Sequence, residues 1–140
     1  MSFIDTNVLV YSTVNNAPFR DRARNALARF GASGPLLISR QILREYLAVM
    51  TREQVWAKPL TLAEAITDAE SFMRRFIVLE DVPAVWTEFV SLSRHAAFGG
   101  RQVHDANIVA TMLAHRERRL VTFNGGDFRR FAGLIDVVTP

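Results

Sequence analysis

Two kinds of hydrophobic pattern alternate along the chain: short uninterrupted apolar runs, and longer segments in which apolar residues recur every three to four positions. The first kind predicts buried strands and the second predicts amphipathic helices. We therefore expect strands within residues 3–11, 35–39, 76–80, 120–123 and 135–139. We expect helices within residues 18–31, 40–52, 61–76, 82–100 and 103–119.

Local signals support several of these boundaries. Gly31 is a typical helix stop, and Thr61 with Glu64 three residues later forms the pattern of a capping box. In the first segment, the polar residues Asp5, Thr6 and Asn7 interrupt an apolar run, and we interpret them as a turn that follows a buried strand.

The alternation of strands and helices predicts βαβ crossovers, and therefore a parallel sheet covered by helices on both faces. We find no internal repeat, low-complexity tract or linker, so we expect residues 1–140 to form a single domain. In open sheets of this kind the ligand crevice lies outside the carboxyl ends of the strands. That edge of the sheet is where candidate functional residues should be sought.

Composition narrows the chemistry. Apolar residues make up 49% of the chain, but no apolar run approaches the roughly 20 residues needed to cross a bilayer, and no signal segment leads the chain. We expect a cytoplasmic protein with no membrane partner. The chain has no Cys, which excludes disulfides, thiolate zinc sites and cysteine nucleophiles. Any metal must be bound by oxygen atoms or by the three His.

Four carboxylates have positions that suggest a shared site. Asp5 follows the first predicted strand and Asp127 follows the strand at 120–123, so both belong at the carboxyl edge of the sheet. Glu45 borders the apolar stripe of its helix, and Asp105 opens the predicted helix "DANIVATML". Taken singly, Asp105 could be a helix cap, Asp127 a turn residue, and Glu45 a solvated side chain.

Carboxylates gathered in one crevice repel each other, and their repulsion must be offset by a cation. The chain has a single Lys and no Cys, so a hard divalent metal ion is the natural solution. Mg²⁺ prefers a few carboxylates, its own waters and a substrate phosphate. The pattern therefore favours chemistry at a phosphoryl group.

Four motifs then identify a resemblance. "FIDTNVLVY", Glu45 in "LREYLAVM", "VHDANIVATM" and "LVTFNGGDFRRF" together resemble the PIN-domain ribonucleases, specifically the VapC toxins of VapBC toxin–antitoxin pairs. The likeness runs nearly from end to end. It implies a three-layer α/β/α sandwich around a short, mainly parallel sheet, an acidic site for Mg²⁺ or Mn²⁺, and endonucleolytic cleavage of RNA, with tRNA or ribosomal RNA as the expected targets.

The resemblance also assigns roles to residues. Asp5, Glu45, Asp105 and Asp127 match the acidic catalytic and metal-binding positions of the family. Either Asp127 or the residue at the position of Asn124 completes the site in different members, and Asn124 cannot supply a charge. Small polar residues that orient ligands and water in the family are matched here by Thr6, Asn7 and Thr122.

We expect Arg side chains to contact the RNA. Of the 17 basic residues all but Lys58 are Arg, which suits bidentate contact with phosphate, although GC-rich coding sequence would produce the same bias. The candidates around the crevice are Arg101, Arg129 and Arg130.

The resemblance further implies a cognate VapB-type antitoxin. The segments 18–31 and 40–52 carry more large apolar residues than one face of a thin sheet needs, so a groove between them could accept an apolar partner helix. Homodimerisation is a competing use of apolar helical faces, and we expect a homodimer.

Two other classes of function stay open. One is a magnesium-binding hydrolase of the phosphatase type, although such enzymes favour "DxDxT" where this chain has "DTNVL". The other is a non-catalytic RNA-binding regulatory domain. Metal-dependent cleavage of RNA that EDTA abolishes would support the nuclease and neither alternative.

Overall fold

Five short strands form one sheet in the order β3-β2-β1-β4-β5. The computed structural model describes residues 1–140, and every neighbouring pair of strands is parallel. The strands are β1 (Ser2–Ile4), β2 (Leu36–Ser39), β3 (Ile77–Leu79), β4 (Arg119–Val121) and β5 (Asp136–Val138). In the centre of the sheet, Phe3 of β1 lies in register with Leu37 of β2 and Leu120 of β4.

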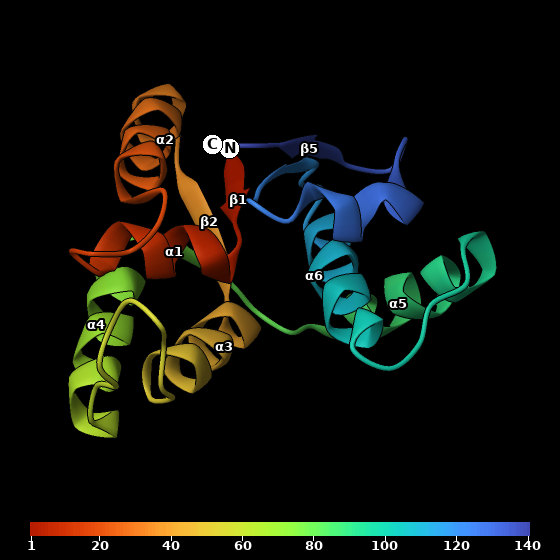
Figure 1. Cartoon of the computed structure of the whole chain (residues 1–140). Coiled ribbons are helices and arrows are strands. Elements are labelled where there is room, and N and C mark those ends of the chain that lie inside the picture. Colours follow the sequence, from red (N-terminus) through yellow and green to blue (C-terminus); the bar gives the residue numbers. More distant parts are fainter.

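Helices cover both faces of this sheet (Figure 1). The helices are α1 (Thr6–Thr13), α2 (Arg20–Ser33), α3 (Arg40–Met50), α4 (Leu62–Arg75), α5 (Pro83–His95) and α6 (Gln102–Ala114), with a 3₁₀ segment, η1 (Gly125–Phe131). The first four helices lie on one side of the sheet, and α5 and α6 pack together on the other (Figure 1). This is the predicted three-layer α/β/α arrangement.

The strand order creates a switch point beside β1. From β1 the chain passes to β2 and then β3 on one side, and it returns across the sheet to β4 and β5 on the other. Connections that diverge in this way leave a crevice at the carboxyl ends of the two central strands. The segments that follow β1 and β4 are therefore brought together there, although more than 100 residues separate them in sequence.

One part of the strand prediction is wrong. The apolar run after Asp5 does not continue β1; residues 6–13 form α1. The Asp5 side chain caps this helix by accepting a hydrogen bond from the backbone N–H of Thr6 at 2.7 Å. Val8, Leu9 and Val10 are all buried, and a helix that is apolar on several sides shows no clear three-to-four periodicity.

Several helix boundaries also differ from the prediction. Helix α2 continues past Gly31 to Ser33, and α5 ends at His95 instead of reaching Gly100. Helix α6 begins at Gln102, so Asp105 lies in its first turn and does not open the helix. The capping signal before α4 is confirmed, because the Thr61 hydroxyl accepts a hydrogen bond from the N–H of Glu64 at 3.2 Å.

None of the helices combines the length and the apolar character that a membrane-spanning helix requires.

Candidate active site

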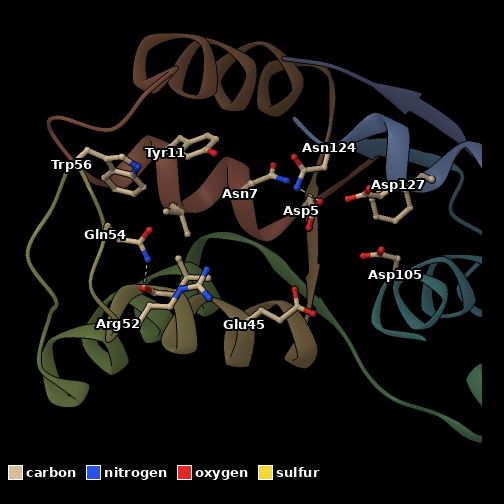
Figure 2. Close-up of a pocket in the computed structure, with 13 residues that line it drawn as sticks. Asp5, Asn7, Tyr11, Glu45, Arg52, Gln54, Trp56, Asp105, Asn124 and Asp127 are labelled. Carbon is tan, nitrogen blue, oxygen red and sulfur yellow. Dashed lines mark hydrogen bonds between the residues drawn. The ribbon is translucent and has the colours of Figure 1, made fainter. Parts of the chain in front are cut away.

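A cleft of about 280 Å³ opens at the carboxyl ends of β1 and β4 (Figure 2). All four carboxylates singled out in the sequence line it. They come from four different parts of the chain: Asp5 from the end of β1, Glu45 from α3, Asp105 from α6 and Asp127 from η1. The fold therefore brings together the acidic residues that the sequence predicts to share a site.

Asp5 is the most enclosed of the four. Its side chain accepts hydrogen bonds from the Thr6 N–H at 2.7 Å, the Thr122 hydroxyl at 2.6 Å and the Asn7 amide at 3.1 Å. These bonds favour the ionised carboxylate, but burial outweighs them and raises the pKa of Asp5 to about 6, with the negative charges of Glu45 and Asp105 adding to the rise.

Asn7 joins the two central strand ends. Its amide nitrogen donates to Asp5 and to the Thr122 hydroxyl at 3.2 Å, and its amide oxygen accepts from the N–H of Phe123 at 3.1 Å. One side chain thus fixes the start of α1 against the end of β4. The predicted orienting residues Asn7 and Thr122 lie in direct contact with Asp5.

Glu45 is held by two donors on opposite sides. One carboxylate oxygen accepts from the Thr6 hydroxyl at 2.7 Å, and the other accepts from the Gln41 amide at 2.7 Å. Gln41 also donates to the carbonyl of His104 at 2.9 Å and accepts from the Asn107 amide at 2.7 Å. This network connects α3 to α6, so it sets the position of Glu45 relative to the helix that carries Asp105.

Sequence reasoning missed Gln41 and Asn107. Each does have a detectable signal, because Gln41 lies one helical turn before Glu45 and Asn107 lies two residues after Asp105 in a largely buried stretch of helix. A polar side chain that close to a proposed acidic residue is a candidate for orienting it.

Asp105 and Asp127 both project into the cleft, from α6 and η1 (Figure 2). Burial raises the pKa of Asp105 to about 6, the charges of Asp127 and Glu45 add to the rise, and Arg130 and His104 oppose it. Asn124 also lines the cleft, and its backbone N–H donates to the Thr122 hydroxyl at 3.0 Å. Both candidates for the fourth position therefore reach the cavity.

Among the cations, Arg52 lines the cleft, whereas Arg101, Arg129 and Arg130 do not. Arg101 and Arg129 are exposed, four residues before Asp105 and two after Asp127 in sequence, and Arg130 donates to the carbonyl of Ala97 at 3.4 Å. Sequence reasoning did not select Arg52, because it falls just beyond the end of α3 in a segment interpreted as the tail of a helix.

The donor set of the cleft suits a hard divalent cation. The acidic groups offer only oxygen atoms, and the raised pKa values of Asp5 and Asp105 reflect burial and mutual repulsion that no cationic partner fully offsets. No three Asp, Glu or His side chains lie close enough to bind one ion together as they stand. Mg²⁺ commonly uses one or two carboxylates and completes its shell with water and substrate phosphate, so this spacing fits it.

The predicted apolar groove between segments 18–31 and 40–52 is not found. Helix α1 packs against both α2 and α3. A hollow does occur nearby, between α1, α2 and α4, and its lining includes Leu27 and Phe72. The apolar residues of α3 are instead used internally, with Leu43, Tyr46 and Met50 buried in the core.

The fold and the site together define an open α/β domain with an acidic cleft at the carboxyl ends of its central strands. The sequence pattern of the PIN domain matches residues 2–134, and the chain belongs to the PIN domain family. The predicted fold class is confirmed.

Named relatives and solved structures agree with this assignment. The chain is 29% identical to Ribonuclease VapC48 of Mycobacterium tuberculosis over 133 residues, which cover 93% of this chain and 91% of the relative. It is 27% identical to Ribonuclease VapC24 of the same organism, with 94% and 91% covered. The fold is similar to a chain of VapBC2 from Rickettsia felis bound to a promoter DNA fragment, with a TM-score of 0.70, 18% identity, and 99% and 97% of the two chains covered.

Proposed function

We propose that this protein is an endoribonuclease that depends on Mg²⁺ or Mn²⁺ and acts as the toxin of a toxin–antitoxin pair. The observation that carries the nuclease proposal is the cleft in which Asp5, Glu45, Asp105 and Asp127 converge from four segments of the chain. Membership of the PIN family and the ribonuclease names of its relatives support the same activity.

Each of the four carboxylates would have a role. One or two of them would bind the cation directly beside the scissile phosphate, and the others would bind it through its water molecules. When bound, the ion supplies a water of lowered pKa and stabilises the charge that develops on the phosphate. Asn7 and Thr122 hold Asp5 in place, and Thr6 and Gln41 hold both oxygens of Glu45, so these hydrogen bonds would orient the two carboxylates toward the ion or its water molecules.

A cleavage assay with total RNA tests the activity. We expect discrete fragments with MgCl₂ or MnCl₂, none with EDTA, and none with a folded Asp5→Asn protein. Asp136→Asn is a matched control, because this exposed residue lies on β5 outside the cleft. Equal cleavage in EDTA, or by Asp5→Asn, would refute the metal-dependent nuclease. Sequencing the 5′ ends of the fragments would identify the RNA target.

The toxin role has its own support and its own test. The relatives are named VapC, and the similar solved structures include a toxin–antitoxin complex from Klebsiella pneumoniae and FitAB bound to DNA. We expect expression of the active chain to arrest growth, and coexpression with an adjacent small reading frame to relieve the arrest. A tag on that small protein should copurify this chain. If it does not and growth stays arrested, the toxin assignment fails while the nuclease assignment stands.

A further inference from the structure

The cleft extends well beyond its acidic end. Opposite the carboxylates it is lined by Tyr11 of α1 and by Arg52, Gln54 and Trp56 of the segment between α3 and α4 (Figure 2). The proposed metal site uses none of these four residues. An aromatic and polar end in the same cavity as the catalytic carboxylates is well placed to bind a neighbouring part of the substrate.

The aromatic rings of this end are held in place. Trp56 and Tyr11 pack edge to face, with ring centroids 6.1 Å apart and an angle of 66° between the rings. Tyr11 in turn packs against Phe123 at 5.2 Å, and Phe123 stacks on Phe19 at 5.3 Å. Because edge-to-face packing does not cover the broad faces of both rings, the indole of Trp56 keeps surface on which a planar group can stack.

Two polar groups at this end, the Arg52 guanidinium and the Gln54 amide oxygen, lack partners within the protein. The Gln54 amide nitrogen donates to the carbonyl of Val49 at 3.0 Å, which fixes the amide, but the amide oxygen has no donor. Arg52 forms no ion pair with any of the four carboxylates that line the same cleft. A cation, an oriented acceptor and an aromatic ring are thus all available to a ligand.

We propose that this end of the cleft is a nucleobase subsite: one unpaired base next to the scissile phosphate stacks on Trp56, while Arg52 contacts a phosphate and the Gln54 oxygen accepts a hydrogen bond from the base edge. The inference rests on the proposed nuclease function and specifies its substrate. A base stacked inside a helix cannot reach the indole, so the RNA must be single-stranded, or looped out, at the cut.

An apolar side chain of a protein partner is the alternative occupant. The structure favours the base, because the aromatic end and the carboxylates belong to one continuous cavity. An apolar side chain would also bury Arg52 and the Gln54 oxygen without giving either a partner, which is unfavourable.

The fluorescence of Trp56 provides a direct test. The chain has two Trp residues, and Trp86 lies on α5, 69% exposed and away from the cleft, so Trp86→Phe leaves Trp56 as the single reporter. We would add Asp5→Asn to prevent cleavage and titrate this protein, in MgCl₂, with short single-stranded RNA oligomers and with a blunt RNA duplex. We expect the single strands to quench Trp56 and the duplex not to.

Affinity measurements complete the test. By fluorescence anisotropy, Trp56→Leu should weaken binding of the same oligomers roughly 5- to 150-fold, the range expected for loss of one stacked base, and Trp56→Phe should retain most of the affinity. Arg52→Gln should reduce the dependence of the affinity on salt concentration by about one phosphate contact.

Several results would overturn the subsite. One is binding of single-stranded RNA without quenching of Trp56, and another is equal quenching by the duplex. A third is normal RNA affinity of Trp56→Leu together with lost binding to the small protein partner, which would assign this end of the cleft to that partner. If RNA quenches Trp56 but the protein that retains Asp5 cleaves no RNA, the nuclease is refuted and the base subsite stands. If that protein cleaves RNA but RNA does not quench Trp56, the base subsite is refuted and the nuclease stands.

Discussion

Asp5 is the most deeply buried of the four carboxylates in the cleft. Its pKa rises from 3.8 to about 6, which corresponds to about 3 kcal/mol of destabilisation at neutral pH in the absence of a cation. The hydrogen bonds from Thr6, Asn7 and Thr122 reduce this cost but do not remove it. The protein therefore carries local instability at the place where the proposed ion binds.

Replacing Asp5 should separate stability from activity. We expect Asp5→Asn to raise the midpoint of thermal unfolding by a few degrees in metal-free buffer at pH 7.5, because it removes a buried charge that Glu45 and Asp105 repel. The gain should be smaller than about 3 kcal/mol, since the amide accepts fewer of the three hydrogen bonds. Calorimetry measures the shift, with Asp136→Asn as the control, and a lower midpoint for Asp5→Asn would contradict the expectation.

The fourth acidic position can be settled by two substitutions. Asp127 is close enough to raise the pKa of Asp105, whereas Asn124 lines the cleft without a charge. We therefore expect Asp127→Asn to raise the MgCl₂ concentration for half-maximal cleavage at least 10-fold, within the range seen when groups around a metal are removed. Asn124→Ala should change it little. If both substitutions have equally small effects, Asp127 has only a structural role in η1 and does not complete the metal site.

At the scale of elements, the site depends on how the junction of β1 and α1 is joined to the end of β4. The Thr122 hydroxyl donates to Asp5, and Asn7 adds a bridge through both atoms of its amide, to the Thr122 hydroxyl and from the N–H of Phe123. Because strands β1 and β4 are only three residues long, these side-chain bonds reinforce the backbone pairing that fixes their carboxyl ends relative to each other.

Asn7→Ala should therefore loosen the site and destabilise the protein. The substitution leaves the Phe123 N–H without its acceptor, which should lower the free energy of unfolding by about 1–3 kcal/mol, as measured by chemical denaturation. Cleavage should fall as well. Asn25→Ala is the control, since Asn25 is exposed on α2 and has no side-chain hydrogen bond. If both variants unfold at the same denaturant concentration, the bridge carries no stability.

Sequence reasoning predicted the elements well where periodicity was clear and failed where it was not. The buried residues of α3 show a clean stripe, whereas α1 is apolar on several sides and was interpreted as a strand and turn. The four carboxylates were found because strand ends and helix starts predict their placement. Gln41 was missed although it lies one turn before Glu45, because its bonds to α6 depend on which helix lies opposite. Arg52 was missed because its segment was interpreted as the tail of α3, which ends at Met50.

For the whole molecule, the balance of charge predicts how stability depends on pH. The pKa values of Asp5 and Asp105 are raised in the folded state, so folded protein binds protons more tightly than unfolded protein. This contribution is fully present below about pH 4 and is lost as the pH rises through about 6. Metal-free protein should thus lose stability between pH 5 and pH 7.5.

Divalent metal should reverse that loss. Denaturation curves across this pH range, with EDTA and with MgCl₂, measure the effect. We expect the two curves to coincide near pH 5 and to separate toward pH 7.5, and Asp5→Asn to show a weaker dependence on both pH and Mg²⁺. Stability that rises with pH in EDTA would contradict the assignment of these two carboxyl groups.

Substrate affinity should also depend on the charge distribution of the whole surface. Arg101 and Arg129 are exposed in the segments that carry Asp105 and Asp127, and Arg52 lines the cleft. Phosphate contacts release counterions, so RNA affinity should fall steeply between 50 and 200 mM salt, roughly 10-fold or more for several contacts. Anisotropy titrations at several salt concentrations test this, and Arg101→Gln or Arg129→Gln should each lower the slope. If the affinity does not depend on salt, these Arg residues do not contact the RNA phosphates.

The order of the segments that build the cleft has a consequence for synthesis of the protein. Asp5 is synthesised early, but the Thr122 hydroxyl that binds its side chain comes 117 residues later, next to the strand β4 that pairs with β1. During synthesis β1 can pair with β2 first, and its second edge stays open until β4 has been made. The cleft is therefore completed late: a chain cut short before β4 and η1 has β1 and β2 but lacks Thr122 and Asp127, and we expect it to be inactive.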